Sequence, residues 1–131
     1  AGHAVRVVMP RYRELRERAV PMTGPVAASF LPLGERAEEQ RVWRSADSAV
    51  PLYFLDIPAA FERKAIYGEP DDHRRFILFA RGVMDTIQYL REVDGWSPDV
   101  VHCHDWHAAL VINYLKTFYH YTFGHMATVY T

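Results

Sequence analysis

The residues best suited to chemistry lie together in the last third of the chain, in the run His102-Cys103-His104-Asp105-Trp106-His107. Imidazole nitrogens donate or accept hydrogen bonds near neutral pH, and they are also common zinc ligands. The run follows the apolar pair Val100-Val101 and precedes a segment with helical spacing of apolar residues. We therefore expect it where a strand ends and a helix begins. Ligands of doubly wound α/β sheets bind at such places, outside the carboxyl ends of the strands.

Three residues of this run have separate expected roles. Asp105 is either the N-cap of the helix or a direct ligand of a substrate, because aspartate is strongly preferred at N-caps. Trp106 is expected to pack the helix onto the sheet. His107, in the first helical turn, is placed to aim its imidazole over the strand ends, where it can exchange a hydrogen bond with a sugar hydroxyl.

A metal site is the weaker alternative for the same histidines. His102 and His104 alternate onto one face of the expected strand, and Cys103 points to the other. With His107 they give an H-x-H-x-x-H spacing, but ligand spacing alone is only a hypothesis and a histidine within a strand is more often a core residue. A lone thiol buried in a strand is also a poor nucleophile, so Cys103 is not a catalytic candidate.

A second candidate region runs from Tyr67 to Arg75. Gly68 and Pro70 shape a loop, and charged residues follow at the start of the next helix, for which Asp71 or Asp72 is a suitable N-cap. The region is either a polar loop leading into a capped helix or a sugar-facing edge with a tyrosine ring for stacking and a carboxylate for hydroxyls. The chain contains no G-x-x-x-x-G-K-[ST] phosphate loop, G-x-G-x-x-G fingerprint or G-x-S-x-G nucleophile elbow.

Length and composition indicate one soluble domain. The 131 residues carry a net charge of −1, which favours neither a nucleic-acid partner nor an anionic membrane surface. The single cysteine fits a reducing compartment, and no apolar run approaches the roughly 20 residues that span a bilayer. No export signal is visible, so we expect a cytoplasmic location.

Strands and helices alternate along the chain. Expected strands are Val5–Pro10, Ala27–Leu33, Glu39–Ser45, Pro51–Leu55, Val100–His104 and Ala127–Thr131, the second and third forming a hairpin, and expected helices run from Arg75 to Val93 and from Trp106 to about Tyr119. The pattern predicts an α/β fold, with a Rossmann-like parallel sheet and flanking helices.

The two ends of the sequence predict an interior segment of a larger domain. Ala1-Gly2-His3 is typical of the exit from a helix, and the chain ends in a strand, whereas such sheets normally begin with a strand and a glycine-rich turn. Without that first strand, Val5–Met9 would present an open sheet edge. Open edges invite pairing with another chain, so we expect self-association.

Several motifs in order resemble the bacterial glycogen synthase and plant starch synthase family. Gly2 to Tyr12 is similar to its GHxVxVxxPxY segment, and Trp96 to Leu110 matches its most distinctive N-terminal motif almost continuously. The intervening landmarks, in a resemblance that covers essentially the whole chain, are Pro51–Asp56, Ile66-Tyr67-Gly68, Asp72 and Arg75-Phe76, with Ala127–Thr131 at the end.

The resemblance implies a GT-B fold and transfer of glucose from ADP-glucose to the non-reducing end of an α-1,4-glucan, with retention and without a metal or other cofactor. It implies that His107 contacts the transferred glucose and that Asp105 and Trp106 hold that helix start. It also implies that Tyr67, Asp72 and Arg75 line or support the acceptor side.

Parts of the family pattern are missing from this sequence. The KxGGLxD loop, the IHN turn and the second domain are absent, so residues 1–131 are expected to form part of an N-terminal catalytic domain that is inactive alone. The alternatives are an autonomous glucan-binding module, suggested by the 14% aromatic content, and a metallohydrolase built on the histidines.

Overall fold

The computed structural model describes residues 2–131, and the chain divides into two compact units, Ala1–Arg75 and Phe76–Thr131. The helix exit expected at the first three residues begins outside the described range. Within that range, Gly2 has a φ of 120°, a conformation that favours glycine. No helix in residues 2–131 is both long and apolar enough to cross a membrane.

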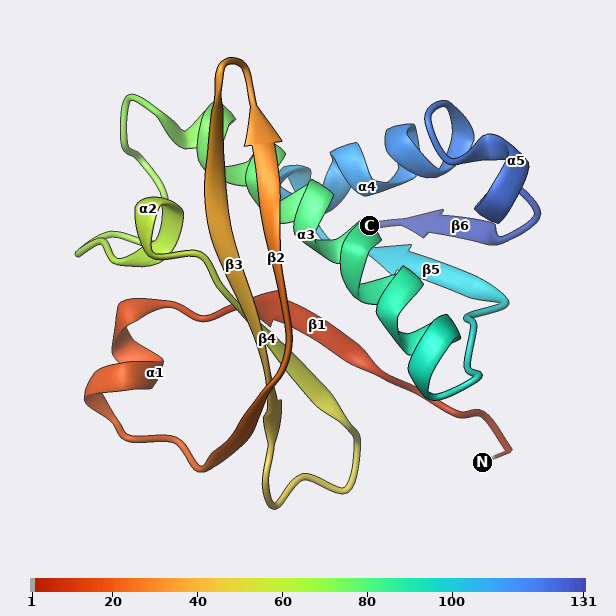
Figure 1. Cartoon of the computed structure of the whole chain (residues 1–131), viewed down its shortest axis with the longest axis horizontal. Helices are drawn as coiled ribbons and strands as arrows, with labels where there is room; N and C mark the ends of the chain where they lie inside the picture. Colours follow the sequence, from red (N-terminus) through yellow and green to blue (C-terminus); the bar gives the residue numbers. More distant parts are fainter. Residues whose placement is uncertain (1) are drawn as a thin grey trace. The chain divides into compact units, whose positions relative to one another are not determined.

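The first unit contains a four-stranded sheet in the order β1-β4-β3-β2 (Figure 1). Its strands are β1 (Val7–Pro10), β2 (Met22–Leu33), β3 (Arg36–Ser45) and β4 (Leu52–Asp56). β1 pairs with β4 in parallel, while β3 is antiparallel to both β2 and β4. The predicted hairpin is thus confirmed, and its strands are longer than expected.

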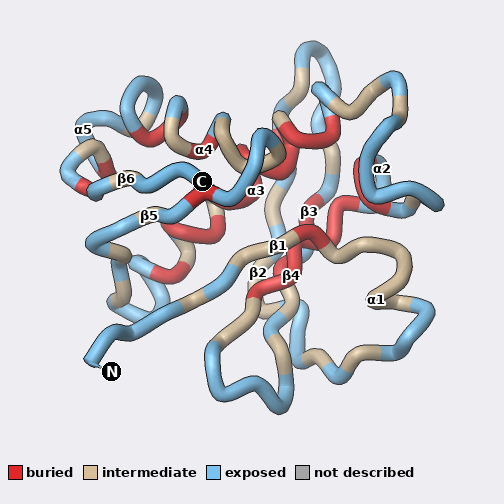
Figure 2. The backbone as a smooth tube through the Cα atoms, turned by 180° about the vertical axis from the view of Figure 1, so that it is seen from behind, coloured by how far each residue is buried: buried red, intermediate tan, exposed pale blue. Residues whose placement is uncertain are grey.

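The core of the first unit is centred on β4, whose residues Tyr53, Phe54 and Leu55 are at most 2% exposed (Figure 2). Two short helices, α1 (Arg13–Glu17) and α2 (Pro58–Phe61), follow the carboxyl ends of β1 and β4. β1 stands at one end of the strand order, so its outer edge pairs with no strand of the described chain.

Helix α3 (Asp72–Val93) crosses the division between the units, which falls after Arg75. Its predicted apolar stripe is confirmed, because every residue of the stripe is at most 7% exposed; the residues are Phe76, Phe79, Val83, Ile87 and Leu90. A stripe at this spacing is what turns a 22-residue segment into an amphipathic helix.

The second unit continues with β5 (Val100–Cys103), α4 (Trp106–Lys116), α5 (His120–Phe123) and β6 (Ala127–Tyr130). β5 and β6 pair in parallel, with α4 between them in the sequence, as the α/β pattern predicts. Both parallel pairs support the predicted fold class.

The prediction that one helix continues to about Tyr119 is wrong. α4 ends at Lys116 because Thr117 leaves helical geometry, with φ −117° and ψ −85°, while its hydroxyl donates to the Asn113 carbonyl at 2.7 Å. The Lys116 ammonium then donates to the carbonyls of Gly124 and Met126, at 3.0 and 2.6 Å, which stabilises the turn leading to β6.

Candidate functional site

The predicted strand end lies between β5 and α4, where Asp105 forms the junction. Its N–H donates to the Thr131 carbonyl at 2.7 Å, and its side chain accepts from the Trp106 N–H at 2.6 Å. Asp105 is therefore the N-cap of α4, which confirms one of its two expected roles. Its φ of 64° and ψ of 168° lie in a region that is costly for any residue except glycine.

His107 lies in the first turn of α4, and its ring is held by two aromatic neighbours. The ring centroid of Phe76 is 4.5 Å away and that of Trp106 is 4.1 Å away. The side chain is 19% exposed, and its Nδ1 lies 3.6 Å from Asp105 Oδ2. This distance is too long for a hydrogen bond, and it makes an ion pair only when the imidazole is protonated. The aromatic contacts therefore fix the orientation of the imidazole.

Trp106 differs from the expectation that it packs onto the sheet. Its ring meets Phe76 of α3 edge-on, with centroids 5.0 Å apart, and the residue is 46% exposed. It therefore packs against a helix and against the neighbouring His107 while remaining exposed.

His102 and His104 form a separate pair on the strand end, as their predicted alternation requires. Their rings stack with centroids 4.1 Å apart, and one hydroxyl, Thr131 Oγ1, lies 3.0 Å from His102 Nε2 and 3.1 Å from His104 Nδ1. Within residues 2–131, no three or more His, Cys, Asp or Glu side chains are arranged to hold a metal ion. The histidine spacing in the sequence therefore does not translate into a ligand set.

Cys103 points away from that pair and is 3% exposed. Burial raises the pKa of its thiol above the ordinary value, and a backbone hydrogen bond with Ile112 offsets this only in part. A neutral, enclosed thiol is unreactive, in agreement with its exclusion as a nucleophile.

The second candidate region is organised around Arg75, whose side chain is 1% exposed. Its Nε donates to the Ala60 carbonyl at 2.7 Å, its Nη2 to the Ile66 carbonyl at 3.1 Å, and its Nη1 to Asp72 Oδ1 at 2.5 Å. Arg75 therefore supports the loop before α3 from inside and does not line a surface.

Asp72 faces the same loop from the start of α3. Its Oδ2 accepts from the N–H groups of Gly68 and Glu69, at 2.6 and 3.2 Å. Burial pushes the pKa of this carboxyl group upward, but the hydrogen bonds from Gly68, Arg75 and Glu69 and the charge of Arg75 outweigh it, so the pKa is lowered. Asp72 begins the helical residues, which leaves Asp71 in the N-cap position.

Tyr67 lies in this loop and is 62% exposed. The predicted site residues thus form two separate groups, one within each unit. Tyr67, Asp72 and Arg75 form one group, and the other consists of residues 105–107.

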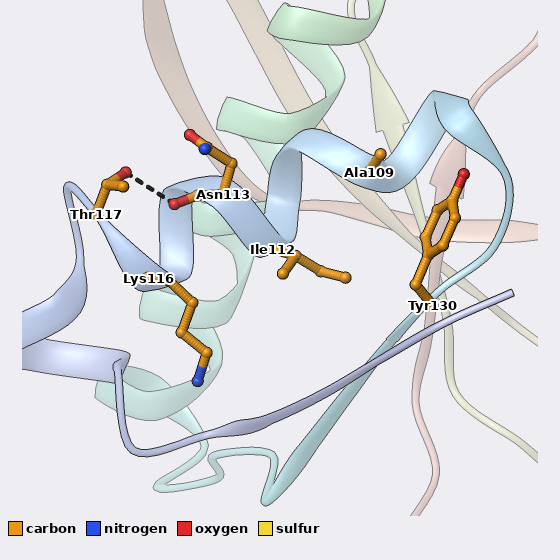
Figure 3. Close-up of a pocket in the computed structure, with 6 residues that line it drawn as sticks. All are labelled: Ala109, Ile112, Asn113, Lys116, Thr117 and Tyr130. Atoms are coloured by element: carbon orange, nitrogen blue, oxygen red, sulfur yellow. Dashed lines mark hydrogen bonds between the residues drawn. The ribbon is translucent and has the colours of Figure 1, made fainter.

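A shallow cavity of about 410 Å³ lies elsewhere on the second unit, between one face of α4 and the end of β6 (Figure 3). It is lined by Ala109, Ile112, Asn113, Lys116, Thr117 and Tyr130. None of these residues belongs to the predicted site. The predicted site residues lie at the start of α4 and in the region from Tyr67 to Arg75.

Two residues that shape the strand end were not identified from the sequence as site residues. Phe76 was assigned only to the apolar stripe of α3, although its place beside Arg75 in the family motif was a usable signal. Thr131 was expected only as the end of a strand. Parallel pairing of β5 with β6 places Cys103 opposite Tyr130. This pairing could have predicted that the hydroxyl of the next residue, Thr131, lies near the two histidines.

The parallel strand pairs, and a helix that is capped by Asp105 at a strand end and carries His107 in its first turn, define a Rossmann-like α/β domain. The sequence profile of the starch synthase catalytic domain matches residues 1–131. The chain belongs to this family of glycosyltransferases, and the resemblance carried by Trp96 to Leu110 is confirmed.

Curated relatives and a solved structure agree with this assignment. The chain is 32% identical to the glycogen synthase of Clostridium acetobutylicum, over 99% of this chain and 27% of the relative. It is 37% identical to the glycogen synthase of Clostridium beijerinckii, over 86% of this chain and 22% of the relative. The catalytic domain of starch synthase IV from Arabidopsis thaliana, bound to ADP and acarbose, superposes with a TM-score of 0.82 at 25% identity, over 98% of this chain and 26% of that one.

The structural match confirms the predicted GT-B fold class. The chain spans about a quarter of the length of the relatives it matches.

Proposed function

We propose that this chain forms one wall of the active site of a glycogen or starch synthase, which transfers glucose from ADP-glucose to the non-reducing end of an α-1,4-glucan. The family assignment over residues 1–131 supports the reaction class. The observation that carries the proposal is the position of His107, in the first turn of a helix that starts at the carboxyl end of β5.

In this proposal the imidazole of His107 exchanges a hydrogen bond with a hydroxyl of the transferred glucose. Phe76 and Trp106 fix the plane of the ring, and Asp105 faces its Nδ1. A donor or acceptor that is already oriented stabilises the transition state without reorganising during the reaction.

The proposed acceptor side is the loop that carries Tyr67, supported by Asp72 and Arg75. An exposed tyrosine ring offers an apolar face and a hydroxyl, the combination that sugar rings bind. We propose no metal or other cofactor, and no nucleic-acid or membrane partner. We further propose that the enzyme acts in the cytoplasm.

Residues 1–131 are proposed to be part of the N-terminal catalytic domain, and catalysis is proposed to need groups outside them. Transfer from ADP-glucose requires stabilisation of a departing diphosphate, which depends on positive or hydrogen-bonding groups aimed at it. We therefore expect the 131-residue chain alone to show no glucosyl transfer from ADP-glucose to glycogen. Measurable transfer by the purified chain would contradict this part of the proposal.

The histidine role is tested in the intact gene product with His107→Ala and His107→Gln. Loss of one oriented hydrogen bond to the transferred sugar is expected to lower kcat by roughly 10²-fold or more. His125→Gln is the matched control, because His125 is exposed in the turn before β6. If the two His107 variants keep kcat within about threefold of the parent, measured beside the control, His107 does not contact the reacting sugar.

We also propose self-association of the chain through β1. This strand ends the sheet order, and Val7 on it is 39% exposed. Open strand edges pair readily with other chains. Light scattering of the 131-residue chain over a concentration series should show mass increasing with concentration, whereas a constant monomer mass would exclude this pairing.

A further inference from the structure

The parallel pairing of β5 with β6 continues one residue past both strands. Thr131 follows the end of β6, and its N–H donates to the carbonyl of Cys103 at 3.1 Å, while its carbonyl accepts from the N–H of Asp105 at 2.7 Å. Bonds to the two neighbours of a facing residue are the parallel ladder pattern, so Thr131 lies opposite His104. The amide of Asp105, two residues beyond β5, is therefore held by the continuation of β6.

The hydroxyl of Thr131 joins two imidazole rings. Thr131 Oγ1 lies 3.0 Å from Nε2 of His102 and 3.1 Å from Nδ1 of His104, and the two rings stack with centroids 4.1 Å apart. A hydroxyl has one proton, so when it donates to one ring it can only accept from the other. In the neutral pair, one imidazole therefore presents an N–H to the oxygen and the other presents a lone pair. The bridge thus couples the tautomers of the two rings.

The backbone beside this bridge is strained. Asp105 has a φ of 64° and a ψ of 168°, and such a conformation of a non-glycine residue persists only where neighbouring contacts hold it. On the side of the strand, these contacts come from Thr131, whose carbonyl binds the Asp105 amide and whose hydroxyl binds the preceding His104. On the side of the helix, Asp105 Oδ1 accepts from the Trp106 N–H at 2.6 Å. Thr131 and the cap together therefore fix the direction in which α4 leaves the strand.

We infer that Thr131 is a positioning residue for glucosyl transfer. Its hydroxyl bridge to the two imidazoles and its main-chain bonds hold Asp105 in place, and this fixes His107 against the transferred glucose. His107 is two residues beyond Asp105, and its Nδ1 lies 3.6 Å from Asp105 Oδ2, so a shift of Asp105 displaces the imidazole. A displacement of about 1 Å at a reacting group can cost roughly 10²-fold in rate. This inference rests on the proposed function and adds to it a residue that acts through Asp105.

The inference is tested with two substitutions of Thr131 in the intact gene product. Thr131→Val keeps the shape of the side chain and the main-chain bonds but loses the hydroxyl, whereas Thr131→Ser keeps the hydroxyl. Thr128→Val is the matched control, because Thr128 lies on β6 opposite Val101 and its side chain points to the other face of the sheet. Urea unfolding of each variant shows whether the protein remains folded.

The first readout is proton–nitrogen NMR correlation on isotope-labelled histidines, which reports the protonated nitrogen of each ring. At a pH where the rings are neutral, we expect His102 and His104 to hold one tautomer each in the parent and in Thr131→Ser. In Thr131→Val the two rings should average between tautomers, and the signal of His107 should move, as it does not in Thr128→Val. Unchanged signals of His102 and His104 in a folded Thr131→Val protein would overturn the inference.

The second readout is kinetic. Thr131→Val should lower kcat about tenfold and leave KM for ADP-glucose and for glucan within about twofold of the parent, because the imidazole acts on the reacting glucose. Thr131→Ser should restore kcat to within about threefold of the parent. Valine conserves more of the side-chain volume than serine, so this rescue identifies the hydroxyl as the cause. An equal loss of kcat in both variants, or a kcat of Thr131→Val within about twofold of the parent, would overturn the positioning role.

A second variant decides the result if Thr131→Val does not fold. His102→Leu removes one partner of the hydroxyl at an exposed position of β5 and leaves β6 unchanged. It should lower kcat without raising either KM, and an unchanged kcat would overturn the inference. Failure of the proposed function has a different signature, because the parent protein would then transfer no glucose while the histidine tautomers remained as expected.

Discussion

The ring of Phe76 meets the imidazole of His107 edge-on, with centroids 4.5 Å apart and ring planes at 76°. Phe76 is 2% exposed and also contacts the ring of Trp106. One buried side chain in the first part of α3 therefore orients two side chains at the start of α4. The orientation of His107, the proposed sugar contact, is therefore set by packing against Phe76, whose side chain has no polar or titratable group.

Removal of the Phe76 ring should cost both stability and catalysis. Phe76→Ala creates a cavity beside His107 and is expected to lower the free energy of unfolding by about 3–5 kcal/mol, with Phe76→Leu costing less. In the intact gene product, Phe76→Leu should also lower kcat, because the imidazole loses the edge contact that fixes its plane. Urea unfolding and initial rates measure the two effects.

The control for this prediction is Phe118→Ala, since Phe118 is 78% exposed. Its effect on stability should stay within about 0.5 kcal/mol. An unaltered kcat in a stably folded Phe76→Leu variant would show that His107 does not depend on the aromatic contact.

Asp105 stabilises α4 through its capping hydrogen bond but adopts a backbone conformation that is costly. Substitutions at this position should separate the two contributions to the free energy of unfolding. Asp105→Gly removes the cap but relieves the positive φ, whereas Asp105→Ala removes the cap and keeps the strain. We expect Asp105→Ala to be the least stable, by about 1 kcal/mol relative to Asp105→Gly. Asp105→Asn, which retains a capping oxygen and carries the same backbone strain as the parent, should remain closest to the parent. Chemical denaturation of the three variants gives the order, and equal stability of the Ala and Gly variants would mean that the backbone strain is absent.

Most elements were predictable from local sequence signals, because those signals are themselves physical causes. The apolar spacing from Phe76 to Leu90 produces the buried stripe of α3, and the turn-forming Leu33-Gly34 joins the hairpin, with Gly34 at a φ of 64°. The N-cap preference of aspartate placed the start of α4 at Asp105. The end of α4 was missed because no single residue type stops a helix at Thr117, and the bonds of Lys116 to the turn before β6 depend on tertiary structure.

The candidate site was less predictable than the fold. Residue types and spacing selected Arg75 and Asp72, but not what they contact. The carbonyls of Ala60 and Ile66 become partners of Arg75 only when the loop closes, and main-chain groups carry no sequence signal. His107 is separated from His102 and His104 because the chain changes from strand to helix between them. At such a junction the distance between side chains cannot be read from their spacing in the sequence.

The buried thiol of Cys103 predicts a loss of stability at alkaline pH. Its pKa is raised by burial above the ordinary value of 9.0, so the unfolded chain releases this proton at a lower pH than the folded protein. The folded state then binds more protons, and the free energy of unfolding falls as the pH rises through 9.0 toward the folded pKa. Urea unfolding at a series of pH values should show this fall in the parent protein.

Cys103→Ala is the comparison, and its stability should fall less steeply between pH 8 and the onset of tyrosine ionisation. Tyr12 and Tyr119 also have raised pKa values, mainly through burial, so both proteins should lose stability at still higher pH. Identical slopes in the two proteins near pH 9 would show that the thiol is not shielded from water.

The lowered pKa of Asp72 predicts the opposite dependence at acid pH. Because this carboxyl group is held below its ordinary value of 3.8, the folded state keeps it ionised at a pH where the unfolded chain has taken up the proton. Its contribution to stability is present above 3.8 and is lost as the pH falls through the folded pKa. The stability difference between the parent and Asp72→Asn should therefore be largest near neutral pH and shrink in acid, as measured by urea unfolding at both. Asp47→Asn, at an exposed aspartate between β3 and β4, should differ little from the parent throughout. A difference between the parent and Asp72→Asn that does not change with pH would mean that the charge of Asp72 does not hold the loop.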